Sequence, residues 1–345
     1  MSVPIEKLLA VKTIVVHSNC PDGLASAMIL DDVLPGREII FAVHKVTKLE
    51  PKPNTLFCDI CPPEDQVEEF RAAGAIVLDH HKGYRGAQEV ITRSFEYHAF
   101  GDENKDPGVS GAVLAYRHVW KPLYEALALH PDGAPSGYAD RYDPVAVEHF
   151  AVLAGIRDTW QTKSFVWQEA CAQAEMLLFY PRTCWIYPDQ PPRLLRTDKG
   201  VELAGRMEVG RIALQSKLAG SKRLAEHADY FASPKGVKVA ILSARYVSDA
   251  ADMVAADFCV GFSFTVESGK QKMLLSTRSR GSYDSTAFCH FYGGGGHTKA
   301  AGCTIDIEPG DLNPYALIRS LIERFETDAH LPVRDNERPI REERG

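Results

Sequence analysis

The sequence predicts an α/β protein with an N-terminal, mainly parallel-sheet domain and a smaller C-terminal α/β domain joined by a helical linker. Three observations support this fold class. The chain has 345 residues, which is enough for two cores of ordinary size. In its first half, short apolar runs alternate with helical patterns, as is typical of a parallel sheet covered by helices. A second alternating set begins at residue 237, after a long amphipathic segment.

Breaks in these patterns place the domain boundaries. The Pro-rich stretch 181–192 ends the helical pattern of the first half, and the last residues are charged with few apolar positions. We expect a larger domain over 1–190, a helical linker over 191–230, a smaller domain over 231–330 and a disordered tail over 331–345.

Composition narrows the class of function. The hydrophobic and charged fractions, 45% and 25%, are those of a soluble globular protein. The formal net charge of -7 argues against a general binder of long duplex DNA, which needs a basic face. No signal peptide or membrane-length apolar run is evident, so we expect a cytoplasmic protein without membrane association. The eight scattered cysteines are interpreted as free thiols.

The first predicted strand covers 12–17 and leads through a tight loop into a helix over 24–34. His17 and Asp22 then lie at the carboxyl end of the strand, where open α/β sheets place their ligands. The alternative is that Asp22 and Gly23 only form a turn.

Three further apolar runs continue this sheet, at 37–43, 55–60 and 75–78. The second reaches Asp59, and the last delivers the triplet Asp-His-His at 79–81. An acid and two imidazoles are costly to bury without partners, so a metal ion explains them economically. Taken alone, such a triplet is more often an ordinary loop. Three polar strand ends on one rim, however, would form a pocket of carboxylates and imidazoles.

The chemistry of this pocket suits divalent cations. Carboxylate and imidazole ligands together favour a borderline ion such as Mn²⁺, and several carboxylates suit two ions that share a ligand. Two neighbouring ions can bind a phosphoryl group and activate water. The sequence therefore indicates hydrolase chemistry.

Helices dominate the next part of the chain. Ser110 is a predicted N-cap, and a helix over 145–156 carries the chain to Asp158. Asp158 is either a solvated helix end or a last metal ligand brought from the helical side. Further helices are predicted over 168–180 and 201–227.

The second domain repeats the alternation of strands and helices. Strands are predicted over 237–242, 258–266 and 272–276, with helices over 248–256 and 285–291.

A glycine run provides the second chemical signal of the sequence. Four glycines at 293–296 precede His297, and Arg278 and Arg280 stand at alternate positions upstream. Glycine-rich backbone can approach phosphates closely, and guanidinium groups match phosphate oxygens. A flexible turn is the alternative for the glycines, but the accompanying His and Arg residues favour a phosphate or nucleotide site.

The ordered motifs resemble the DHH phosphoesterase superfamily, in the branch with a DHH-associated C-terminal domain (nanoRNase- or oligoribonuclease-like, RecJ-related). The resemblance extends over residues 12–325. Its blocks are HSNCPDG, CDICPP, LDHHK, the SGA helix start, IRDTW, STRS and GGGGHTKAAG. It implies two Mn²⁺ ions in the N-terminal lobe, with Mg²⁺ or Co²⁺ as alternatives, a nucleotide on the C-terminal lobe and an active site in the cleft.

The resemblance also implies residue roles. The implied metal ligands are His17, Asp22, Asp59, His80 and Asp158, with Asp59 bridging the ions. His81 would lie beside the scissile phosphate, and Asp79 would orient a histidine. The expected substrate contacts are Ser110, Arg278, Arg280, Gly294, Gly295, Gly296 and His297. One departure from the family pattern is Leu24, which stands where many members have a further Asp, so one ion would have fewer protein ligands.

The expected activity is manganese-dependent hydrolysis of short nucleotides to mononucleotides. Expected substrates are short oligoribonucleotides, linear dinucleotides such as pApA, cyclic dinucleotides or nucleoside 3′,5′-bisphosphates. Two alternatives stay open: a pyrophosphatase or polyphosphatase of the same superfamily, and a non-catalytic nucleotide sensor. The sequence leaves the oligomeric state open, with a homodimer as one option.

Overall fold

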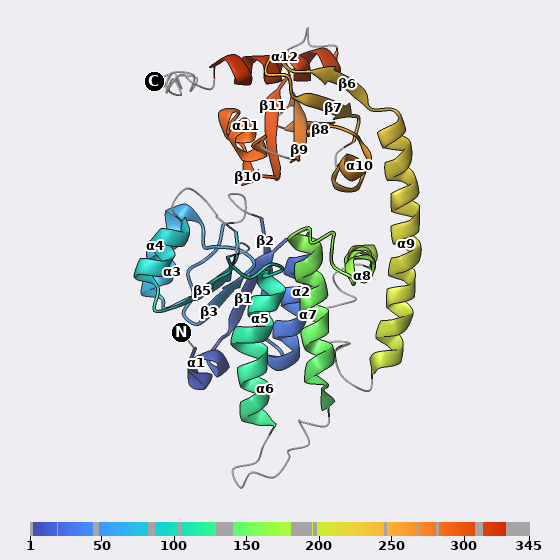
Figure 1. Ribbon diagram of the computed structural model, residues 1–345. Coiled ribbons are helices and arrows are strands. Elements are labelled where there is room, and N and C mark those ends of the chain that lie inside the picture. The colour runs from blue at the N-terminus through green and yellow to red at the C-terminus, as the bar shows by residue number, and fades with distance from the viewer. Residues whose placement is uncertain are drawn as a thin grey trace, which may run out of the picture. The chain divides into compact units, whose positions relative to one another are not determined.

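The computed structural model describes residues 3–18, 20–43, 48–81, 87–102, 105–128, 141–180, 195, 199–244, 247–267, 269–280, 283–307 and 313–328. The chain divides into two compact units, 1–215 and 216–345 (Figure 1). The predicted tail over 331–345 lies outside the described residues.

The N-terminal unit is built on a five-stranded sheet in which every strand runs parallel to its neighbours. Its spatial order is β2-β1-β3-β4-β5. The strands are β1 (Thr13–His17), β2 (Glu38–Ala42), β3 (Thr55–Cys58), β4 (Ile76–Asp79) and β5 (Tyr97–Phe100). This architecture confirms the predicted fold class. The strand β5 was not predicted.

Helices cover both faces of this sheet, which explains why its strands read as continuous apolar runs. On one face, α3 (Val67–Ala72) and α4 (Ala87–Ser94) pack over Val15, Phe57 and Val77, which belong to one hydrophobic cluster. The side chains alternate along each strand, so the positions between them face the other side.

The other face is covered by α2 (Pro21–Val33), α5 (Gly111–Ala115) and α7 (Pro144–Asp158), which pack on one another (Figure 1). The strand residues on this side include Ile14 and Leu56, both fully buried. The helix α2 begins at Pro21, three residues before its predicted start, because proline suits the first turn of a helix.

The remaining helical elements of the N-terminal unit extend this second layer or flank the sheet. They are α1 (Ile5–Leu9), the 3₁₀ turn η1 (Glu64–Gln66), the π-helical segment η2 (Tyr116–Trp120), α6 (Lys121–Leu127) and α8 (Trp167–Phe179). The long helix α9 (Gly200–Glu226) contains the boundary between the two units.

The C-terminal unit contains a six-stranded mixed sheet in the order β10-β11-β9-β8-β7-β6. Only β7 and β8 pair in parallel. The strands are β6 (Asp229–Ala232), β7 (Lys238–Leu242), β8 (Phe258–Glu267), β9 (Lys270–Ser279), β10 (Gly295–His297) and β11 (Ala300–Asp306). The three predicted strands correspond to β7, β8 and β9, whereas the other three were not predicted.

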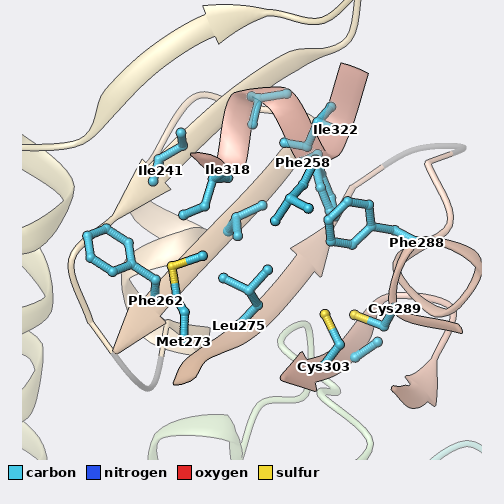
Figure 2. Packing of buried hydrophobic residues seen from close by; sticks show 14 residues of the cluster. Ile241, Phe258, Phe262, Met273, Leu275, Phe288, Cys289, Cys303, Ile318 and Ile322 are labelled. Atoms are coloured by element: carbon cyan, nitrogen blue, oxygen red, sulfur yellow. The ribbon is translucent and has the colours of Figure 1, made fainter. Parts of the chain in front are cut away.

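Two hydrophobic clusters hold helices on the two faces of this sheet. On one face, α11 (Ser285–Phe291) and α12 (Pro314–Asp328) pack over a core that includes Phe258 and Met273 (Figure 2). On the other face, α10 (Ser248–Met253) packs over a second cluster. Within the described chain, no helix combines the length and apolar character that crossing a bilayer requires.

Two glycines of α9 provide a test of how this helix packs. A Cβ added at Gly210 would lie 2.2 Å from the carbonyl oxygen of Ala172 in α8, whereas one at Gly205 would meet nothing within 4 Å. We expect Gly205→Ala to stabilise the protein by about 0.5–1 kcal/mol through helix propensity. Gly210→Ala should instead destabilise it by about 1–3 kcal/mol through overpacking. Thermal unfolding of both variants checks this, and equal shifts would contradict the close α8–α9 contact.

Candidate metal centre

Three adjacent strands end at the same edge of the parallel sheet and bring polar side chains together. The strand β1 ends at His17, β3 is followed by Asp59, and β4 ends at Asp79, directly before His80 and His81. In the sheet order these strands are neighbours. The predicted gathering of strand ends on one rim is therefore present in the structure.

Asp59 lies at the centre of this group because of an unusual backbone conformation. Its φ of 63° is in the left-handed region, which Asp tolerates better than most residues. The backbone N–H of Asp59 still donates to Leu78 O at 2.9 Å, so the turn is fixed to the neighbouring strand. Asp59 Oδ1 lies 3.2 Å from His80 Nε2, and Asp59 Oδ2 lies 3.8 Å from His17 Nδ1. Each carboxylate oxygen thus faces a different imidazole.

Asp22 enters the centre from the first turn of α2. Its Oδ1 accepts hydrogen bonds from Ser110 Oγ at 2.6 Å and from the Ala112 N–H at 3.2 Å. Its Oδ2 is buried and has no hydrogen-bond partner among the described residues, although the residue is only 1% exposed. An unsatisfied buried carboxylate oxygen is costly, so this atom suits a cation ligand.

Ser110 holds Asp22 in position by a hydrogen bond. It is fully buried, caps α5 by accepting from the Val113 N–H, and donates to Asp22. This burial does not fit the predicted substrate contact, and the structure instead supports a positioning role. Gly111 is part of the same arrangement, because a Cβ there would lie 2.3 Å from Asp59 Cβ.

Asp158 reaches the centre from the helical layer. It is the last residue of α7, and its Oδ2 lies 3.3 Å from His80 Nε2. Asp22, His80 and Asp158 offer ligand atoms that all lie within 4.8 Å of one another. All five residues that the sequence resemblance implied as metal ligands are thus brought together.

Asp79 fixes the turn that carries both histidines. Its Oδ1 accepts the backbone N–H groups of His80 at 2.8 Å and His81 at 3.1 Å, and also His81 Nδ1 at 2.8 Å. Because a carboxylate only accepts, His81 Nδ1 must carry the proton of that contact. This placement of Asp79 behind His81 fits its predicted orienting role.

Burial and mutual charge shift these groups in opposite directions. Burial raises the pKa of Asp22 well above its usual value, and the nearby Asp59 and Asp158 raise it further. Burial alone would also raise the pKa of Asp59, but the hydrogen bond from His80 and the charge of His81 hold it well below its usual range. Burial alone would lower the pKa of His81, whereas the Asp79 carboxylate raises it to about 9.

These donor groups could hold metal ions. Four carboxylates and three imidazoles in a mostly buried pocket leave a negative balance that a cation would offset. Oxygen and nitrogen donors together suit borderline divalent ions.

Cys20 also lies at this centre, although the scattered cysteines of the sequence predict only free thiols. It is the N-cap of α2, its Sγ accepts the Gly23 N–H at 3.3 Å, and the sulfur lies 3.5 Å from Asp59 Oδ2. Its position between His17 and Asp22 in the first motif is the sequence signal that could have indicated it.

The predicted arginines of the C-terminal unit have partners within that unit. Arg278 donates to Ser248 Oγ at 2.6 Å and to its neighbour's carbonyl, Thr277 O, at 2.7 Å. Arg280 donates to the carbonyls of Ala251 at 2.9 Å and Val254 at 3.2 Å, at the end of α10. Both guanidinium groups therefore help to hold α10, and their contact with a substrate stays a prediction.

Part of the glycine run lies in a strand: Gly295 and Gly296 begin β10, whereas Gly293 has a φ of 74° in the turn before it. Gly295 and Gly296 pair with Gly302 and Ala301 across the β10–β11 hairpin. A Cβ at Gly294 would lie 2.1 Å from Gly302 O, so these glycines allow close approach of two backbones. The strand β10 lies at the edge of the sheet, and contact of these glycines with a substrate stays a prediction. The side chain of His297 lies outside the part that the structure describes.

Fold and centre together define a two-unit α/β protein with an Asp- and His-rich, metal-type centre at the carboxyl edge of a parallel sheet. No protein-family model and no curated protein sequence matches the chain. A solved structure described as the DHH domain of a member of a ribosomal protein family is similar, with a TM-score of 0.55 at 10% identity. That likeness covers 94% of this chain and 87% of the other. The chain therefore has the fold of DHH-domain proteins, as the motif resemblance predicts.

Two further solved structures align with lower TM-scores and add nothing to this assignment. One is a pGpG-specific phosphodiesterase, PggH, from Vibrio cholerae, with a TM-score of 0.40, 16% identity, and coverage of 90% of this chain and 98% of that one. The other is an exopolyphosphatase-related protein from Bacteroides fragilis, with a TM-score of 0.47, 11% identity, and coverage of 92% of each chain.

The raised pKa of Asp22 predicts that metal binding releases protons. Without a cation, the Asp22 carboxyl keeps its proton to higher pH than an ordinary Asp does, so a metal must displace that proton. The affinity for a divalent ion should therefore fall as pH falls. Calorimetric titration with Mn²⁺ in two buffers of different ionisation enthalpy measures the release. Asp22→Asn should bind more weakly and release fewer protons, and unchanged release would contradict this assignment.

Proposed function

We propose that this protein is a manganese-dependent phosphodiesterase that hydrolyses short nucleotides to mononucleotides. The observation that carries the proposal is the convergence of buried carboxylates and imidazoles around Asp59 at the carboxyl edge of the sheet. The DHH-type fold of the chain supports the same class of function by analogy.

The two oxygens of Asp59 support a centre with two metal positions. One position would use Asp59 Oδ2 with His17, and the other would use Asp22, His80 and Asp158. Divalent ions bound there would supply Lewis-acid activation of water and of the phosphoryl group. The left-handed turn at Asp59 fixes the direction of its carboxylate, and Ser110 holds one oxygen of Asp22 by a hydrogen bond.

His81 is the group that we propose to face the scissile phosphate. Its ring is partly exposed, unlike that of His80, which is completely buried. Because Nδ1 donates to Asp79, Nε2 is the ring nitrogen directed to a substrate. The histidine can then hold or transfer a proton at that atom while Asp79 fixes its orientation.

Short substrates fit the charge of the chain better than long ones. With a formal net charge of -7, the protein lacks the general basic character that neutralises an extended nucleic acid. We therefore place linear dinucleotides and short oligoribonucleotides first. The C-terminal unit would bind the base and sugar of the nucleotide.

The first experiment incubates the protein with 5′-phosphorylated diadenylate and measures the release of mononucleotide by chromatography. Reactions contain Mn²⁺, Mg²⁺, Co²⁺ or a chelator, and parallel reactions measure phosphate release from pyrophosphate and tripolyphosphate. Metal-dependent release of mononucleotide supports the proposal. Phosphate release alone indicates a pyrophosphatase or polyphosphatase. Tight binding of the dinucleotide without any turnover indicates a sensor, and either result would overturn the proposal.

Asp59→Asn tests the central carboxylate. Asn tolerates the left-handed backbone conformation and keeps the shape of the side chain, so the fold should persist. Turnover should fall by at least roughly 100-fold, because even changes behind the ligands of metal sites cost ~10–100-fold. Asp65→Asn, at an exposed position of η1, serves as the matched control and should retain full activity. Wild-type turnover in Asp59→Asn, with its circular dichroism unchanged, would exclude this centre as the active site.

A further inference from the structure

Cys20 occupies a position that brings its sulfur into the metal centre. It has extended backbone (φ -128°, ψ 139°) immediately before α2, three residues after His17. Its Sγ lies 3.5 Å from Asp59 Oδ2 and accepts the Gly23 N–H at 3.3 Å. The sulfur therefore lies between the first turn of a 13-residue helix and the central carboxylate.

Unsatisfied buried atoms in this position and in the adjoining one indicate a ligand. His17 Nδ1 is a buried atom without a hydrogen-bond partner among the described residues, and it lies 3.8 Å from Asp59 Oδ2. Asp22, two residues after Cys20, is 1% exposed, and its buried Oδ2 also has no such partner. The ligand atoms of His17, Cys20 and Asp59 all lie within 4.8 Å of one another. A nitrogen, a sulfur and an oxygen thus converge where buried polar atoms are unsatisfied.

Two buried thiols, one in each unit, have different surroundings from that of the partly buried Cys20. Cys58, adjacent to Asp59 in sequence, directs its sulfur to Gly111 O at 3.3 Å. Cys289 contacts Thr277 Oγ1 at 3.5 Å in the core of the C-terminal unit. Among the cysteines that the structure describes, Cys20 alone belongs to a group of potential metal ligands.

We propose that Cys20 is a metal ligand, which together with His17 and Asp59 forms a mixed nitrogen, sulfur and oxygen position that favours Zn²⁺, Co²⁺ or Fe²⁺ over Mg²⁺. This inference rests on the proposed metal centre and adds a sulfur donor to it. Thiolate ligands select softer ions, and imidazole suits the same group of metals. On binding, the S–H bond breaks, the proton leaves to solvent and the sulfur–metal bond forms. Burial and the nearby carboxylates raise the pKa of the Cys20 thiol well above its usual value, and the Gly23 N–H opposes this in part. A cation must therefore displace the thiol proton.

The competing explanation is that Cys20 acts only as the N-cap of α2. Cys20→Ser separates the two roles, because serine is a strong N-cap but a poor ligand for soft ions. The metal-free variant should therefore unfold at the wild-type temperature or above it. Cys58→Ala, which removes the neighbouring thiol that faces Gly111 O, is the matched control.

The test uses Co²⁺ as a spectroscopic probe on the full chain. Wild-type protein with one equivalent of Co²⁺ should show a near-ultraviolet sulfur-to-cobalt charge-transfer band. We expect Cys58→Ala to keep this band and Cys20→Ser to lose it, while visible cobalt bands show that Cys20→Ser still binds the ion. Competition titrations should show Co²⁺ and Zn²⁺ affinity reduced at least ~10-fold in Cys20→Ser, with Mg²⁺ affinity nearly unchanged.

The outcomes separate this inference from the proposed function. In one outcome, wild-type protein binds cobalt without a charge-transfer band, and Asp59→Asn weakens this binding. That result overturns the sulfur ligand but leaves the proposed metal centre intact. A band that persists in Cys20→Ser also overturns it. If wild-type protein does not bind cobalt specifically, both the proposed metal centre and the proposed sulfur ligand are overturned. If Cys20→Ser does not fold, X-ray absorption spectroscopy of wild-type protein with one equivalent of Zn²⁺ tests the sulfur ligand instead. One sulfur at ~2.3 Å from the zinc supports the inference, and no sulfur at that distance overturns it.

Discussion

The left-handed turn at Asp59 is the constraint on which the N-terminal unit depends. A parallel strand normally continues into its connection with extended backbone, but here the chain bends immediately after β3. Such a conformation costs on the order of 1–3 kcal/mol in a residue other than glycine, so the surroundings must hold it. They do so through the bond from its N–H to Leu78 O and through close packing against Gly111. The imidazoles, Asp22 and Cys20 are all positioned relative to this one carboxylate.

The charges of the centre explain why its carboxylates have hydrogen-bond donors around them. Neighbouring carboxylates repel each other, and hydrogen-bond donors reduce this cost at two of the four carboxylates, Asp79 and Asp22. Asp79 receives two backbone N–H groups and His81, and Asp22 receives Ser110. Asp59 faces the imidazoles of His80 and His17, whereas the buried Oδ2 of Asp22 has no hydrogen-bond partner among the described residues. A buried carboxylate oxygen without a partner, next to other carboxylates, is a feature of cation sites.

Much of the N-terminal architecture could be predicted from sequence, because central parallel strands read as continuous apolar runs. Once the strands were identified, the rule that ligands gather at their carboxyl ends also predicted the rim with His17, Asp59 and the triplet at 79–81. Short peripheral elements such as α1 and β5 were missed because a few residues carry too little pattern. The predicted start of α2 was late because Pro21 was interpreted as part of a loop.

Roles that depend on distant partners could not be predicted in the same way. Ser110 meets Asp22 across 88 positions of sequence, and no local pattern encodes that contact. The β10–β11 hairpin was missed because glycines have no hydrophobic alternation, so the run at 293–296 resembled an open loop. Cys20 was overlooked because its chemistry depends on the direction of its sulfur, which only the turn before α2 fixes.

The position of Asp158 at the end of α7 has a consequence for how the protein matures. The ligand groups are spread from the first strand to this late helix, and a polypeptide is synthesised from its N-terminus. During translation, the earlier carboxylates therefore exist for some time without the last one. A complete centre can arise only after the ribosome has released α7 and this helix has packed on the sheet. The groups that could hold an ion are then complete only late in the synthesis of the N-terminal unit.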